Sequence, residues 1–255
     1  MASMCENAPV RSSRSTRAPV MNFPKSFIGS DVVNGTLRFV PNQKRVPIIL
    51  TDHARLPSHP LWITLCKPNA TMETISLFLK ERLFYLREIC PVKVFYVIVV
   101  GGGENITSAM LQYYRHSSDD LVETLFETIT QLDNYCMDHG DIITFGHVIP
   151  RPCEMDNHVS LNAPPVRREL SRIYLHVNNF ISRLNHANRR PALILDKFFE
   201  FTRVFGVATH YPGTRQNLIR RIRFDRRDYR TLSENGLSKL HMALRRLVNT
   251  PEYLQ

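Results

Sequence analysis

A strand-like apolar run followed by a glycine turn constrains this chain more than any other segment. Residues 94–100 (VFYVIVV) are all apolar or aromatic, and three glycines follow at positions 101–103. Such an uninterrupted run predicts a strand buried on both faces, which belongs in a parallel sheet, and glycine lets the backbone turn where a side chain would collide. Ligands of open α/β sheets bind at the carboxyl ends of the strands, where Asn105 would lie. A polar cap in a strand-to-helix turn is the simpler explanation of this residue.

Apolar segments with strand-like and helix-like spacing alternate along the chain. Short runs at residues 46–50 and 61–65 stop at polar residues, as strands do where they enter a loop. Between the strands, apolar residues recur every three or four positions, which predicts helices that bury one stripe. The alternation predicts a three-layer α/β/α sandwich with a mainly parallel sheet. Helices are expected at residues 71–86, 121–132, 173–184 and 233–248, and further strands within residues 141–152 and 192–196.

The first part of the chain has a different composition. Residues 1–25 lack apolar periodicity and contain the basic segment 11–17 (RSSRSTR) between prolines, which is typical of disorder. Strand-like spacing begins only after residue 45. We therefore predict a basic, largely disordered tail over residues 1–44 and one α/β domain over residues 45–255, which is long enough to bury a full core.

Composition disfavours several classes of protein. No stretch approaches the roughly 18 consecutive apolar residues of a membrane helix, and residues 1–25 lack the apolar segment of a secretory signal. The cysteines are too widely spaced for a zinc site or a disulfide framework, and the histidines lack metal-binding spacing. We expect an intracellular protein, cytoplasmic or nuclear, with no membrane association, no metal and no cofactor. The five cysteines, expected to be reduced, are Cys5, Cys66, Cys90, Cys136 and Cys153.

Basic residues are concentrated in the last third of the chain. Residues 167–255 hold 18 Lys and Arg against 7 Asp and Glu, whereas residues 47–166 hold 8 against 14. Arginine predominates, and it binds phosphate through paired hydrogen bonds. Such a distribution suits RNA, DNA or another polyanion, and a solvated basic face explains it equally well. Nucleic acid or protein partners are therefore expected, and the arginine cluster consists of Arg220, Arg221, Arg223, Arg226, Arg227 and Arg230.

The loops after the first two predicted strands carry short polar motifs. These are residues 51–53 (TDH) and residues 67–70 (KPNA). The first resembles Gly-Asp-Ser, the block that holds the nucleophile in the SGNH, or GDSL, hydrolases. The second resembles their Lys-Pro-Gly-Ala segment. Asp52 matches the aspartate of the first block, whereas His53 stands in the place of the serine and Asn69 in the place of the glycine.

Two later segments extend the resemblance. Gly103 and Asn105 match the Gly-x-Asn block of the family. Residues 228–233 (DYRTLS), which precede the terminal helix, match Asp-x-x-His-Leu-Ser except that Thr231 replaces the histidine. The blocks occur in the family's order over most of the chain, and they are most similar to those of the divergent intracellular domains found in retroelements. The resemblance therefore implies the α/β/α fold of these hydrolases, with the strands in flavodoxin-like order.

The departures from the family concern the residues that would carry out catalysis. Acyl transfer needs a hydroxyl or thiol nucleophile and a base that takes its proton. His53 would be a poor nucleophile, and Thr231 cannot act as the base. The resemblance implies that Asn105 would face an oxyanion and that Asp228 would orient the base, so both would be remnants of a site. Asp52 is not expected to orient His53, because adjacent side chains in a turn usually point apart.

Two interpretations of function follow. The first is a catalytically degenerate SGNH-hydrolase-like domain, a pseudoenzyme that acts as an intracellular binding or scaffolding module for nucleic acid or protein, of mobile-element or viral type. The alternative is an active acyl-ester hydrolase with an unrecognised nucleophile. Ser58 lies in the same loop as His53, and a shift in register would bring His210 or His241 to the position of the base. We favour the interpretation without enzymatic activity.

Overall fold

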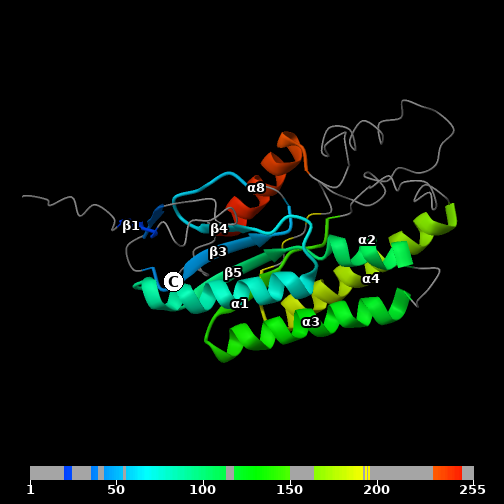
Figure 1. Ribbon diagram of the computed structural model, residues 1–255, viewed down its shortest axis with the longest axis horizontal. Helices are drawn as coiled ribbons and strands as arrows, with labels where there is room; N and C mark the ends of the chain where they lie inside the picture. The colour runs from blue at the N-terminus through cyan, green and yellow to red at the C-terminus, as the bar shows by residue number, and fades with distance from the viewer. Residues whose placement is uncertain are drawn as a thin grey trace, which may run out of the picture.

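A four-stranded parallel sheet lies at the centre of the protein in the computed structural model (Figure 1). The strands lie in the order β4-β3-β5-β6, and a parallel bridge between Gly146 and Leu193 continues the sheet beyond β6. This is the order of a flavodoxin-like sheet, as predicted. The strands are β3 (Val46–Thr51), β4 (Ile63–Cys66), β5 (Phe95–Val100) and β6 (Ile142–Phe145).

The structure describes only part of the chain, and the observations below concern that part. Within it, no helix combines the length and the apolar character needed to cross a bilayer. The arginine cluster and most of the strand predicted at residues 192–196 lie outside it. The described residues are 20–24, 36–39, 43–53, 56–112, 118–149, 164–191, 193, 195 and 232–248.

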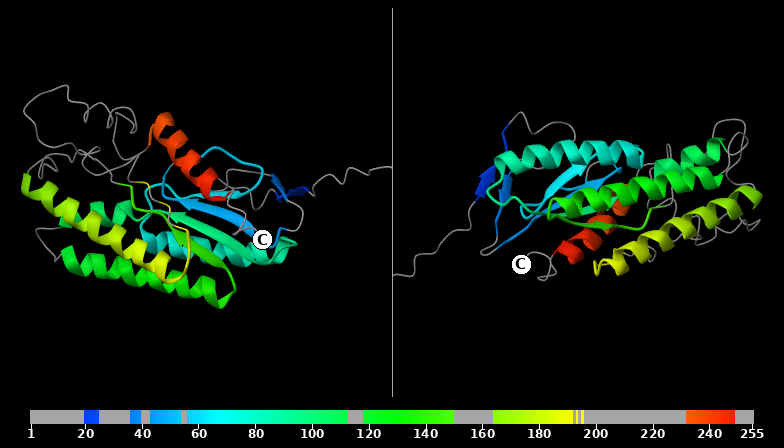
Figure 2. Two further views of the ribbon diagram at one scale, coloured as in Figure 1. Left: turned by 180° about the vertical axis from the view of Figure 1, so that it is seen from behind. Right: turned by 90° about the horizontal axis from the view of Figure 1, so that it is seen from below.

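Helices cover both faces of the sheet and form the three predicted layers (Figures 1 and 2). A right-handed crossover places the connection between parallel strands on a fixed face. The helices after β4, β5 and β6 therefore share one face, and Figure 1 shows α8 on the other. The helices are α1 (Met72–Ile89), α2 (Gly103–Gln112), α3 (Ser118–Asp138), α4 (Pro164–Ala187) and α8 (Glu234–Val248).

Local sequence explains β5 and α1. β5 lies between β3 and β6, and all six of its residues are buried, as its uninterrupted apolar run predicts. The side chain of Thr71 caps α1 by accepting the N–H of Thr74. The predicted apolar stripe of α1, which includes Ile75 and Leu83, is buried. Both elements thus follow from periodicity in the sequence.

The N-terminal segment differs from the expected disordered tail. β1 (Val20–Asn22) pairs antiparallel with β2 (Thr36–Arg38). Phe23, Leu37 and Phe39 are buried in the same core as the parallel sheet. The N–H of Arg38 also donates to the carbonyl of Pro60 at 2.7 Å, which joins β2 to the loop between β3 and β4. The predicted disorder of residues 1–44 therefore does not extend to these two segments, because their few apolar residues have a place in the core.

α4 is longer than the predicted residues 173–184, and polar side chains in its C-terminal half bind the backbone and side chains at the edge of the sheet. Asn185, which is buried, accepts the N–H of Phe145 at 3.3 Å and donates to its carbonyl at 2.7 Å. This amide binds the backbone of β6 much as a neighbouring strand would. Two further bonds along the same edge join Ser182 to His147 (2.8 Å) and Asn178 to Val148 (2.8 Å).

Candidate functional site

The carboxyl ends of β3, β4 and β5 lie level at one edge of the sheet. Thr51 pairs with Cys66 on one side and with Val100 on the other. The N–H of Asp52, the first residue after β3, donates to the carbonyl of Val100 at 3.2 Å. The three loops that carry the predicted motifs therefore leave the sheet together. We call the set Asp52, His53, Asn69, Gly103 and Asn105 the carboxyl-edge site.

Asp52 and His53 face each other in a sharp bend after β3. Both are buried, with 1% and 2% of their surface exposed. The hydroxyl of Thr51 accepts the N–H of His53 at 3.1 Å, which holds the bend. The bend brings Nε2 of His53 to 3.5 Å from Oδ1 of Asp52. The expectation that these side chains point apart is therefore wrong, although 3.5 Å is longer than a normal hydrogen bond to a carboxylate.

Asn69 adopts a left-handed backbone conformation with φ of 55°. This region is unfavourable for most side chains, and asparagine tolerates it better than the others. The glycine that the resemblance places here would suit the same geometry. The N–H of Asn69 donates to the carbonyl of Asp52 at 3.0 Å, which ties the loop after β4 to the loop after β3.

Glycines after β5 permit the close approach of α1. A Cβ atom on Gly101 would lie 2.6 Å from Cδ1 of Ile75 and 3.5 Å from Cγ of Asp52. Gly102 has a φ of 96°, which only glycine adopts readily. The turn leads directly into α2, whose first residue is Gly103. Close packing against Ile75 thus explains Gly101, and the backbone conformation explains Gly102.

The side chain of Asn105 is bound to the start of α1. Its Oδ1 accepts the N–H of Met72 at 2.7 Å, and its Nδ2 lies 3.0 Å from both carboxylate oxygens of Glu73. The first N–H groups of a helix have no partner within that helix, so Asn105 acts as an additional cap supplied by another loop. Both ends of the amide that the resemblance assigns to an oxyanion are engaged by α1.

Glu73 is the residue of this arrangement that sequence reasoning missed. It lies in the first turn of α1 and is exposed. An acidic residue in a first turn is a signal in the sequence, but that signal indicates only a favourable interaction with the helix dipole. The pairing of Glu73 with Asn105 joins residues 32 positions apart, and local spacing does not reveal it.

Other predicted site residues lie outside the described part of the chain. Asp228, Thr231 and His210 are among them, as are all six arginines of the arginine cluster. Their approach to the carboxyl-edge site stays a prediction. Within the described ranges, no three His, Cys, Asp or Glu side chains are grouped so that they could hold a metal ion.

An aromatic cluster joins α8 to the loop between β3 and β4. The ring of His59 stacks on Trp62, with centroids 3.7 Å apart and planes at 9°. The ring of His241 lies 5.5 Å from that of Trp62 and 6.1 Å from that of His59. Trp62 directly precedes β4, at the amino end of the sheet, so His241 packs away from the carboxyl-edge site. Ser58, the alternative nucleophile, is exposed in this loop and shares no hydrogen bond with a histidine of the described ranges.

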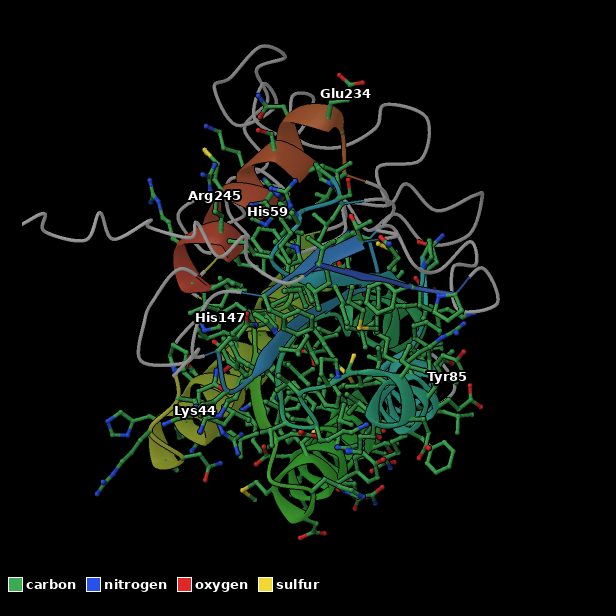
Figure 3. The ribbon with its side chains drawn as sticks, turned by 90° about the vertical axis from the view of Figure 1, so that its left-hand side faces the viewer. Lys44, His59, Tyr85, His147, Glu234 and Arg245 are labelled. Carbon is green, nitrogen blue, oxygen red and sulfur yellow. The ribbon has the colours of Figure 1, made fainter. Side chains whose placement is uncertain are left out.

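The surroundings of the two histidines in this cluster favour their neutral form. The N–H of Leu61 donates to Nδ1 of His59 at 3.2 Å, which requires an unprotonated Nδ1. Burial lowers the pKa of His59, and the charges of His241 and Arg245 lower it further. Burial, followed by Arg245, also lowers the pKa of His241. Figure 3 shows His59 beside Arg245 of α8.

Two solved bacterial structures share this architecture. A GDSL-like lipase from Bacteroides thetaiotaomicron matches with a TM-score of 0.52 at 14% identity, over 83% of this chain and 91% of the lipase. A proposed acylhydrolase from Bacteroides fragilis matches with a TM-score of 0.50 at 13% identity, over 83% and 89%. No protein-family model and no curated protein sequence matches the chain. The chain has an SGNH/GDSL-like fold, which confirms the resemblance at the level of the fold.

Proposed function

We propose that this chain, whose fold is that of the SGNH/GDSL hydrolases, has lost their catalytic apparatus and acts as a binding or scaffolding module inside the cell, of mobile-element or viral type. A fold of this kind supports many functions, so the function has to be inferred from the residues of the site. Two positions that would carry the nucleophile and the base are His53 and Thr231. Neither provides the group that acyl transfer needs.

The engagement of the Asn105 amide by α1 is the observation that carries this proposal. An oxyanion hole needs N–H donors that are preorganised toward the substrate. Nδ2 of Asn105 lies instead against the carboxylate of Glu73, and the N–H of Asn69 donates to the carbonyl of Asp52. The burial of His53 further supports a structural use of these positions.

A fluorophosphonate probe, which bonds covalently to an activated serine, tests the loss of activity. We expect no labelling of the purified full chain and no hydrolysis of short acyl esters above background, because no serine occupies the nucleophile position. An active serine hydrolase labelled in parallel serves as the positive control. Stoichiometric labelling of any serine would overturn the proposal.

An active acyl-ester hydrolase is the second candidate, and the similarity to a GDSL-like lipase favours it. Ser58 is its best nucleophile, because this side chain is exposed in the loop after β3. The variant Ser58→Ala distinguishes the two candidates. If this variant abolishes labelling and ester turnover without changing the free energy of unfolding, the second candidate is correct.

Nucleic acid is the partner that the charge distribution supports best. The arginine cluster gives the last third of the chain its largest charge density. In the described part of that third, Arg183 of α4 and both Arg245 and Arg246 of α8 are exposed. Binding to phosphates through such residues would depend strongly on salt and weakly on base sequence.

A salt titration with a single-stranded oligonucleotide tests this partner. Neutralising Arg220, Arg221, Arg226 and Arg227 to Gln should weaken binding and reduce the slope of log K against log salt by roughly 0.7–0.9 for each phosphate that is no longer bound. A control variant neutralises four arginines of α4 and α8, Arg172, Arg183, Arg245 and Arg246. Equally weakened binding in both variants would assign binding to total charge, and unchanged binding in both would leave a protein-binding scaffold.

A further inference from the structure

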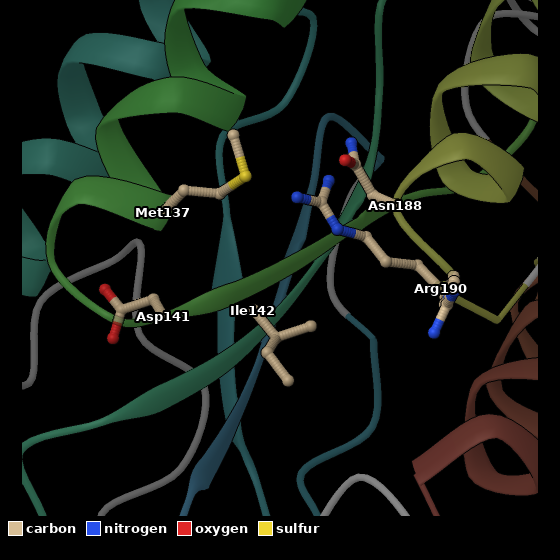
Figure 4. A pocket seen from close by; sticks show the side chains of 6 residues that line it. Met137, Asp141, Ile142, Asn188 and Arg190 are labelled. Atoms are coloured by element: carbon tan, nitrogen blue, oxygen red, sulfur yellow. The ribbon is translucent and has the colours of Figure 1, made fainter.

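A cavity of about 250 Å³ opens beside the amino end of β6, at the edge of the sheet opposite the carboxyl-edge site (Figure 4). Liquid water occupies about 30 Å³ per molecule, so the cavity has room for roughly eight non-hydrogen atoms. It lies where the end of α3, the start of β6 and the end of α4 meet. Its lining residues are Met137, Asp141, Ile142, Asn188, Arg189 and Arg190.

Arg190 is a buried cation with unused hydrogen-bond donors. Its side chain is 6% exposed, and its Nη1 donates to Oδ1 of Asp133, which is also buried. Nδ2 of Asn188 donates to the other oxygen of Asp133 at 3.2 Å. A guanidinium group has five N–H donors, and among the described residues only Nη1 of Arg190 has a side-chain acceptor. The remaining donors are not fully buried, and because Arg190 lines the cavity they are available to an acceptor bound there.

The other charges around the cavity determine the sign of its ligand. Oδ1 of Asp141 accepts the N–H of Phe95 at 2.8 Å, and Oδ2 accepts a hydrogen bond from Arg87. The charge of Asp141 is thus already compensated. Arg189 is exposed and has no ion-pair partner among the described residues. The lining therefore carries one uncompensated positive charge, which suits a monoanion.

We propose that this cavity binds a small organic carboxylate. The carboxylate group would accept hydrogen bonds from Arg190 and Asn188, because a guanidinium group matches a carboxylate in planar, paired geometry. A short apolar body would contact Met137 and Ile142, the two apolar lining residues. Figure 4 shows the side chain of Met137 extending toward Asn188 and Arg190. This site does not depend on the function proposed above, since it lies at the opposite edge of the sheet.

Benzoate is a suitable probe because it combines one carboxylate with a small apolar ring. We expect benzoate to shift the ¹H–¹⁵N resonances of the Arg190 side chain and the Asn188 amide in the full chain, with a Kd of about 1–10 mM for a ligand of this size. Neutral benzamide, which has the same shape, should bind at least about tenfold more weakly because it cannot form the charge-assisted pair. The absence of shifts at about 50 mM benzoate, or equal affinity for benzamide, would overturn the proposal.

Two variants test whether benzoate binds in this cavity, and both leave the buried ion pair of Arg190 and Asp133 intact. Met137 is 45% exposed, so Met137→Trp should fold and fill the cavity, weakening benzoate binding by at least about tenfold. Gln131→Trp adds the same ring at an exposed position of α3 outside the lining and should leave binding unchanged. Unchanged binding in Met137→Trp, or equally weakened binding in both tryptophan variants, would contradict the proposal.

Discussion

Single residues at the carboxyl ends of the strands hold the three motif loops together. Asn105 binds α1 through both ends of its amide, and the N–H of Asn69 binds the carbonyl of Asp52. Each contact joins loops that follow different strands. Groups that could stabilise a transition state are thus used to satisfy buried backbone and helix-end groups, whose exposure would cost free energy.

The amide of Asn105 should matter for stability. We expect Asn105→Ala to lower the free energy of unfolding by about 1–3 kcal/mol, because the N–H of Met72 loses its acceptor. Glu73→Ala, which removes only the second partner of the amide, should cost less. Urea unfolding followed by circular dichroism measures both. An Asn105→Ala protein of unchanged stability that loses a measurable ester turnover would identify a working active site.

The left-handed backbone conformation of Asn69 leads to a second prediction about stability. With φ of 55°, Asn69→Ala should lower the free energy of unfolding by about 1–2 kcal/mol, because alanine bears the full cost of the left-handed region. Asn69→Gly removes the same side-chain atoms but suits the conformation, so its stability should lie above that of Asn69→Ala. Thermal denaturation of the pair isolates the effect of φ. Equal stabilities of the two variants would contradict it.

At the scale of elements, polar and aromatic contacts position the helices at the borders of the sheet. α4 binds the free side of β6 through Asn185, and α8 is joined to the loop between β3 and β4 through His241. Both contacts depend on side chains that do not belong to the apolar stripes of these two helices. The positive charge of Arg245 acts on His241, so protonation of this ring would place two positive charges near each other. The attachment of α8 is therefore sensitive to protonation of the histidine.

The attachment of α8 should weaken in acid. The pKa values of His59 and His241 lie below 6.5 in the folded protein, so the unfolded chain binds more protons as the pH falls below that value. The stabilisation is present above pH 6.5 and is lost as the pH falls through the lower folded values. The urea midpoint should therefore decrease from pH 7 to pH 5.

Substitution of one ring tests the origin of this dependence. His241→Leu should show a smaller decrease in the urea midpoint between pH 7 and pH 5, because one of the two titrating groups is removed. His186→Gln, at an exposed position of α4, serves as the control and should behave like the unmodified protein. A decrease of the same size in all three proteins would assign the effect to other groups.

At the scale of the whole molecule, one core includes the N-terminal pair of strands as well as the parallel sheet. Figure 1 shows β1 at the border of the domain, near the amino ends of the central strands. β2 is hydrogen-bonded to the loop between β3 and β4, which in turn contacts α8. Residues before the α/β pattern therefore contribute to the stability of the domain.

Two apolar residues in this pair should respond very differently to substitution. Leu37 is fully buried, so Leu37→Ala should lower the free energy of unfolding of the whole domain by about 2–5 kcal/mol. Val20, in the partner strand, is 55% exposed, and Val20→Ala should change it by no more than about 0.5 kcal/mol. A single cooperative transition in urea, followed by circular dichroism, measures both. Similar small effects of the two substitutions would show that the pair is not part of the core.

The sequence by itself determined the elements whose signals are local. The run at residues 94–100, the stripe of α1 and the alternation of strands and helices predicted the sheet and its layers, because periodicity reports which side of an element is buried. The motif blocks also pointed to the fold that the solved neighbours share.

Only the tertiary structure decided how residues distant in the chain are paired. Asn105 meets Glu73, His59 meets His241, and Leu37 enters a core that begins at residue 46 by sequence pattern. None of these contacts has a period or a fixed spacing, because each joins separate elements that tertiary packing brings together. The use of each polar residue at the carboxyl edge was therefore set by the neighbours that packing supplied, and the residue type alone could not specify it.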